Sequence, residues 1–163
     1  MALDDCITFI RDSDSCILKE PSTLPEIPDG LELPEDLRYF YEQAGGAVLF
    51  QGADHSIEIV EPVDFVRANS VIRGEPGEYD VSYNWFIVAQ SEPQYISIDL
   101  NLGRAGRCYD SFWDRHALRG DCPIISHSFT ELLQRLIEGK GQCLFWLADD
   151  FVSMGDAYDD VPE

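Results

Sequence analysis

The stretch 33–46 constrains the fold more than any other part of this 163-residue chain. Its apolar side chains recur at i, i+3, i+4 and i+7 and so share one helical face: Leu37, Phe40, Tyr41 and Ala44. Pro34 suits the first helical position, where a backbone N–H would have no partner. Gly45 can adopt the left-handed conformation that ends a helix. We therefore predict an amphipathic helix over 34–44, followed by a strand over 47–50.

The downstream sequence predicts further strands. Residues 56–60 alternate and should form a hairpin with the first strand. Residues 85–89 are continuously apolar, as in a strand buried on both faces, and residues 95–100 alternate strictly. Only a short turn separates these two runs, so they should pair antiparallel, and a last strand is predicted over 107–111. Either Trp85 or Phe86, together with Ile98, should be almost fully buried.

Helices are predicted near both ends of the chain. The first covers residues 3–11, with Ile7 and Ile10 facing inward. A capping box formed by Ser128 and Glu131 opens the last, over 129–138. Helices around consecutive strands indicate an α+β fold, a single domain over residues 1–163 with a central antiparallel meander sheet flanked by helices.

Three connecting segments complete this description. Residues 20–34 hold four prolines and form a stiff irregular connector. Residues 63–72 fit a helix or a strand equally well, and residues 73–84 should form a loop. The segment 148–163 is an acidic tail that we expect to be solvated.

Charge limits the possible partners. Thirty-one acidic residues oppose eleven basic ones, for a formal net charge of −20. Such a surface repels nucleic-acid phosphates and anionic lipid, and it attracts basic proteins. Solubility alone is the simpler explanation of the charge. No run is apolar enough to span a membrane, and the acidic N-terminus is unlike a signal peptide, so we expect a cytoplasmic protein.

Candidate chemical sites are weak. The five cysteines are odd in number and widely spaced, which is typical of reduced, mostly buried thiols. One set offers zinc-ligand chemistry but lacks the close ligand pairs of structural zinc sites: Cys108, His116, Cys122 and His127. A hydrolase could use His116 with Asp110 or Asp114, yet no nucleophile elbow is present. We expect no catalytic residue, no metal and no cofactor.

The stretch 109–116 is the best candidate for a protein interface. It combines aromatic residues, two aspartates and an arginine where a strand is expected to end. Tyrosine, tryptophan and arginine are the commonest interface anchors, and aspartates can meet a basic partner. The predicted partner-binding residues are Tyr109, Asp110, Trp113 and Asp114. The alternative is that Phe112 and Trp113 only cover one end of the sheet.

Several motifs occur together in the order and spacing of one known family: 33–46, 85–89, 96–99, 106–110 and 129–137. In these motifs the chain resembles the SUKH superfamily, which includes yeast cell-wall-synthesis regulators and bacterial immunity proteins of toxin systems. The resemblance covers roughly residues 30–138. It implies a non-enzymatic protein-binding domain, most simply an immunity protein that neutralises a basic toxin such as a nuclease. An intracellular regulatory scaffold with another protein partner, and a hydrolase or metal enzyme, are the alternatives.

Overall fold

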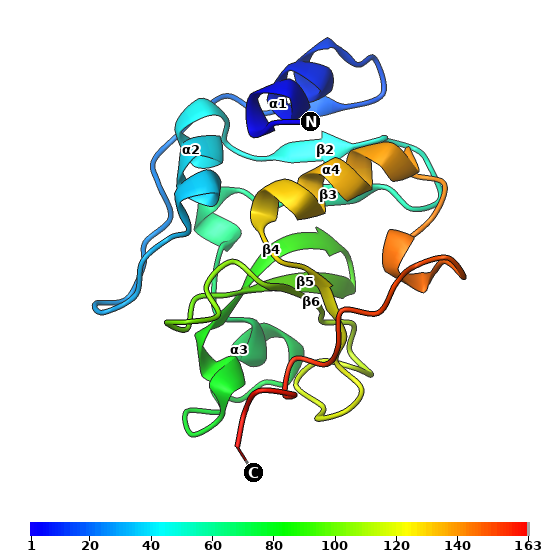
Figure 1. Ribbon diagram of the computed structural model, residues 1–163. Helices are drawn as coiled ribbons and strands as arrows, with labels where there is room; N and C mark the ends of the chain where they lie inside the picture. The colour runs from blue at the N-terminus through cyan, green and yellow to red at the C-terminus, as the bar shows by residue number, and fades with distance from the viewer. Residues whose placement is uncertain (163) are drawn as a thin grey trace.

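Seven strands pair in the order in which they follow one another along the chain, and every pair is antiparallel (Figure 1). The computed structural model describes residues 1–162. The strands are β1 (Ile17–Leu18), β2 (Ala47–Leu49), β3 (Ile57–Ile59), β4 (Trp85–Ser91), β5 (Gln94–Asp99), β6 (Cys108–Asp110) and β7 (Ile124–Ser126). The α+β class and the antiparallel meander sheet are confirmed. The sequence patterns did not predict β1 and β7, which have two and three residues.

Three helices gather around the N-terminal half of the sheet: α1 (Leu3–Asp12), α2 (Glu35–Gln43) and α4 (Phe129–Gly139). In Figure 1, α4 crosses in front of β2 and β3, with α1 above it and α2 to its left. Their apolar stripes meet in one core, where the rings of Phe40 and Phe129 lie 5.2 Å apart. Ile7 and Ile10 are buried as predicted. Each such side chain removed from water contributes about 1.5–3 kcal/mol to stability.

The connections settle what the sequence left open. The segment 63–72 is helical at both ends, with a 3₁₀ turn at Pro62–Asp64 and the short helix α3 (Ala68–Ile72), and between them Arg67 forms an isolated antiparallel bridge with Phe86. Two further 3₁₀ turns occur at Val81–Asn84 and Phe145–Leu147. No helix within residues 1–162 is both long and apolar enough to cross a membrane.

The end of α2 differs from its prediction. Gly45 was predicted to end the helix in the left-handed conformation, and this is wrong. The backbone is extended at Ala44, and the residue with positive φ is Gly46. Gly45 is needed for space, since a Cβ there would collide with the backbone carbonyl of Glu20. A Cβ on Gly46 would lie 2.8 Å from the Ile59 oxygen. Both glycines therefore allow the chain to pass closely between its neighbours as it enters β2.

The centre of the sheet is covered on both faces. Trp85 and Ile98 are fully buried and Phe86 nearly so, as predicted, but the polar face of β5 is buried as well, including Ser97 and Asp99. The first core lies under α2 and α4, and a smaller second core contains Trp85, Tyr109, Cys122 and Tyr158. The rings of Trp85 and Tyr109 lie 4.3 Å apart there.

The C-terminal segment supplies part of this second core, so the expectation of a solvated tail is wrong for residues 156–158. Asp156 forms a bridge with Pro123 next to β7, and its carboxylate accepts hydrogen bonds from the backbone N–H groups of Gly120 and Cys122. The Arg119 guanidinium donates to the carbonyls of residues 158, 161 and 162. The exposed acidic part is limited to residues such as Asp149, Asp150, Asp159 and Asp160.

Candidate partner-binding site

The predicted interface stretch divides into a buried half and an exposed half. Tyr109 and Asp110 lie in β6 and are 0% exposed, whereas Trp113 is 70% exposed and Asp114 is exposed. The division follows the end of β6: all three residues of the strand are buried, and Trp113 and Asp114 lie in the turn after it. Of the four predicted residues, Trp113 and Asp114 can therefore contact a partner directly, and Tyr109 and Asp110 cannot.

Asp110 holds the turn that presents Trp113. Its carboxylate accepts hydrogen bonds from the Phe112 backbone N–H at 3.0 Å, from Trp146 Nε1 at 2.8 Å and from Arg115 at 3.0 Å. Burial raises the pKa of Asp110, and these three donors oppose that rise only in part. The turn is thus tied to the sheet through one buried carboxylate, which fixes the backbone on which Trp113 sits.

Tyr109 acts on the other side of the same strand. Its hydroxyl donates to the Asp99 carboxylate at 2.5 Å, which joins β6 to β5. Burial is the main cause that raises the pKa of Tyr109, and the nearby Asp99 charge adds to it. The pair is a structural contact inside the second core.

The two aromatic residues after β6 have different environments. Phe112 is half-buried, with its ring 6.0 Å from that of Trp146, so it does cover one end of the sheet. Trp113 does not cover the sheet, because its side chain is exposed. Its backbone N–H donates to Gln94 Oε1 at 3.0 Å. We call the area formed by Gln94, Trp113 and Asp114 the Trp113 surface.

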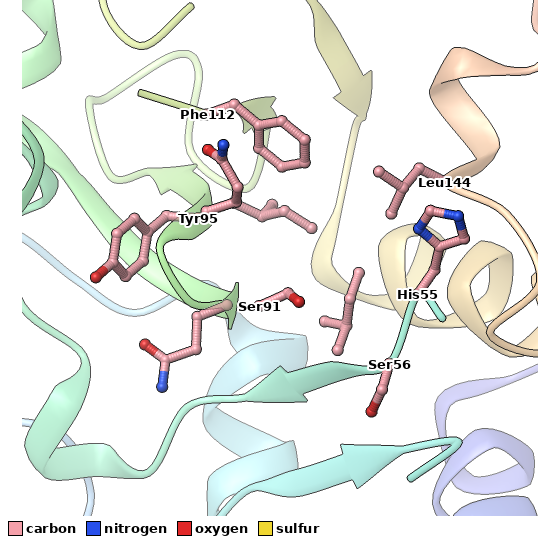
Figure 2. Close-up of a pocket in the computed structure, with 10 residues that line it drawn as sticks. His55, Ser56, Ser91, Tyr95, Phe112 and Leu144 are labelled. Carbon is pink, nitrogen blue, oxygen red and sulfur yellow. The ribbon is translucent and has the colours of Figure 1, made fainter. Parts of the chain in front are cut away.

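An apolar cavity of about 150 Å³ opens beside this surface (Figure 2). It lies where β3 and β5 begin and β4 and β6 end, because an antiparallel meander brings alternate strand ends together. Apolar side chains form its walls: Ile57, Ile96, Phe112 and Leu144. Figure 2 shows Phe112 and Leu144 above it, with Ser91 and Ser56 below. Gln94 lines the cavity as well, so the cavity and the Trp113 surface are continuous.

The hydrolase hypothesis required His116 to contact Asp110 or Asp114, but its ring nitrogens contact two other residues. Its Nε2 lies 2.6 Å from Asn69 Oδ1 and its Nδ1 lies 2.9 Å from Ser111 Oγ. An amide oxygen only accepts, so Nε2 carries the proton and Ser111 donates to Nδ1. Burial lowers the pKa of His116 to about 4, and the Arg73 charge adds to this effect. All three residues are buried, so this Ser–His–Asn contact has no face open to a substrate.

The four candidate zinc ligands are also held apart in different contacts. Cys108 and Cys122 are buried with their thiols directed at backbone carbonyls of Gly106 and Asp110 respectively, and burial raises the pKa of each to about 12. His127 is exposed. Within residues 1–162 no three His, Cys, Asp or Glu side chains gather in a way that could hold a metal ion. All five cysteines are free, and only Cys143 is exposed.

Sequence reasoning missed most of the cavity. Its walls come from four strand ends and from Leu144, which follows α4. The alternation of the 95–100 run did not reveal the cavity, because it puts Tyr95 and Ile96 on opposite faces of the strand although both line the cavity. Leu144 lies 48 positions from Ile96, so no local pattern could relate them.

Comparison with known proteins places the chain in a family. No family model matches it. It is 48% identical over 162 residues to a protein of Bacillus subtilis (strain 168) named immunity protein YokJ. These aligned residues are 99% of this chain and 98% of that protein. The aligned region therefore spans the sheet and the helices. The chain belongs to the family of the immunity protein YokJ.

Proposed function

We propose that this chain is an immunity protein of the SUKH superfamily, which neutralises a cognate protein toxin by binding it in the cytoplasm. The observation that carries the proposal is the relation to YokJ, which extends over both chains almost from end to end. The order of motifs in the sequence and the meander sheet agree with the SUKH resemblance. The chain acts here by binding and not as an enzyme.

The net charge of −20 supports a basic toxin surface as the partner. A nuclease toxin has this property, because it must attract nucleic-acid phosphates. An acidic inhibitor would compete with the nucleic acid for the same basic groups. No cofactor or nucleic acid takes part in this mechanism.

The Trp113 surface is the proposed contact area. An exposed indole beside a carboxylate combines apolar area with a charge that faces a basic partner. Tyr109 and Asp110 contribute as positioning residues: Asp110 fixes the turn that carries Trp113, and Tyr109 holds β6 against β5. All four predicted residues thus serve binding, two by contact and two through the backbone.

The test uses the toxin domain encoded by the gene adjacent to that of this chain. Co-expression of this chain should restore growth of cells that produce the toxin domain, and the two purified proteins should form a complex. Association should slow steeply as salt rises, while dissociation changes much less, since long-range attraction is screened over about 8–10 Å at physiological salt. Trp113→Ala should weaken the complex more than Asp114→Asn does.

Unfolding curves of both variants are the control, and both should match the wild type because neither side chain is buried. Absence of both growth rescue and complex formation would refute the proposed function. Full binding by a folded Trp113→Ala, Asp114→Asn double variant would place the interface elsewhere.

A further inference from the structure

We propose that the cavity beside Trp113 is an anchor pocket that receives one aromatic or branched apolar side chain of the basic partner protein. This inference rests on the proposed function and names the chemistry by which the partner is held. Four observations support it.

The first is size. The cavity measures about 150 Å³. Pockets for cofactors and drug-sized ligands usually enclose about 300–1,000 Å³. An apolar cavity of about 150 Å³ holds one benzene-sized molecule. The occupant is therefore a single side chain, such as that of phenylalanine, leucine or isoleucine.

The second is the arrangement of the walls. Ile57 and Ile96 belong to the main core and are held by their strands, so the floor of the pocket is formed before anything binds. Phe112 and Leu144 are partly buried against the same core. Polar groups line the pocket around these walls, among them Ser91 and Gln94. An apolar centre inside a polar rim is the usual arrangement around an interface anchor.

The third is continuity with the Trp113 surface. Gln94 lines the pocket and also accepts the hydrogen bond from the Trp113 backbone. Phe112, the residue before Trp113, is one wall. The exposed indole and the pocket are therefore neighbouring parts of one surface, which a single partner can contact together.

The fourth is charge. No Lys or Arg lines the pocket. Exposed acidic residues adjoin its lining and the indole in the sequence: Asp54 next to His55, Glu92 next to Ser91, and Asp114 next to Trp113. Two cations lie nearby. Lys140 is exposed, and its neighbour Gly141 accepts a hydrogen bond from the His55 backbone, whereas Arg115, next to Asp114, is paired with the buried Asp110 carboxylate. The surroundings thus favour an apolar side chain flanked by lysine or arginine on the partner.

Two variants alter the pocket while keeping Gln94, Trp113 and Asp114; Ser91 pairs with Gln94 across the β4–β5 hairpin, whereas Leu144 lies on another segment. Ser91→Phe places a bulky group at an exposed position of the lining. Leu144→Ala removes one wall. Their matched controls are Ser70→Phe, exposed on α3, and Leu102→Ala, which is 99% exposed at the opposite end of β5. Binding to the toxin domain encoded by the adjacent gene is measured by titration calorimetry, with the unfolding curve of each variant recorded alongside.

We expect Ser91→Phe and Leu144→Ala to weaken the complex by at least about tenfold, as loss of an anchor does, while both controls bind like the wild type. If the wild type binds and Trp113→Ala weakens the complex, but both pocket variants bind as tightly as their controls, the pocket inference fails and the proposed function stands. If the wild type does not bind, the proposed function fails and this inference with it. If the wild type alone self-associates and Ser91→Phe makes it monomeric, the occupant is a second copy of this chain and the inference is overturned.

Discussion

The buried histidine provides a quantitative test of the structure through pH. His116 lies between Asn69 and Ser111, and burial lowers its pKa to about 4 from an ordinary value of 6.5. The folded protein therefore holds the neutral ring, whereas the unfolded chain takes up a proton near pH 6.5. This stabilising contribution is complete above that pH and is lost as pH falls toward the folded pKa.

Linkage gives the size of the effect. For these two pKa values, the contribution of His116 to the free energy of unfolding falls by about 2 kcal/mol between about pH 7.5 and about pH 5, and by about 3 kcal/mol at about pH 4. His116→Gln removes the titration while keeping a side-chain amide that can donate to Asn69 and accept from Ser111. Urea unfolding of wild type and variant is measured at each pH.

The comparison between the two proteins isolates the histidine. Burial raises the pKa of both Asp99 and Asp110, and these groups change stability in the opposite direction as pH falls. They are present in both proteins, so their effect cancels in the difference. His116→Gln should be less stable than the wild type at neutral pH and lose this disadvantage near pH 5. If the two stabilities differ by the same amount, within about 0.5 kcal/mol, at every pH, the buried neutral His116 is refuted.

Three further predictions concern stability and composition. Asp110→Ala should lower the free energy of unfolding by about 2–4 kcal/mol, because the Trp146 indole and the Phe112 N–H lose their buried acceptor. The control variant Asp114→Ala, at an exposed position, should stay within about 0.5 kcal/mol of the wild type. Equal urea midpoints for the two variants would contradict this. Gly46→Ala should cost more than about 1 kcal/mol, since its Cβ would press on the Ile59 carbonyl at positive φ, and unchanged thermal unfolding would argue against the described turn. The purified protein should contain no stoichiometric zinc by elemental analysis, and Cys122→Ser should be within about 1–2 kcal/mol of the parent; one bound equivalent that disappears in this variant would show a metal site.

The regular elements were predictable because their signals are local. The stripe of Leu37, Phe40 and Tyr41 located α2, and the runs at 85–89 and 95–100 located β4 and β5 with their antiparallel pairing. β7 was missed because its three residues have no alternation, and the turn that presents Trp113 separates it from β6. Hydrophobic periodicity needs more residues than such a strand contains.

The candidate site was predictable only in part, since its geometry depends on distant contacts. Residue types in 109–116 indicated a candidate interface, which stays a prediction, and they did not reveal that Asp110 is buried against Trp146, 36 positions further along the chain. The role of His116 likewise depends on Asn69, 47 positions before it. The C-terminal residues were predicted to be a solvated tail because most of them are acidic or polar. The two side chains that enter the second core, Ala157 and Tyr158, form no apolar pattern in the sequence.

The strands lie in the sheet in the same order as along the chain, and this order affects how the chain can fold while it is synthesised. Each strand pairs with the strand made just before it, so the sheet can extend during translation without waiting for a distant partner. The second core cannot close in this way, because Tyr158 is made after all seven strands and packs against Trp85 in β4. Until then the indole of Trp85 and the carboxylate of Asp80, which later accepts from the Tyr158 hydroxyl, lack this cover. A nascent chain should thus hold a formed sheet with one open face, and any chaperone that assists its folding should act on that face.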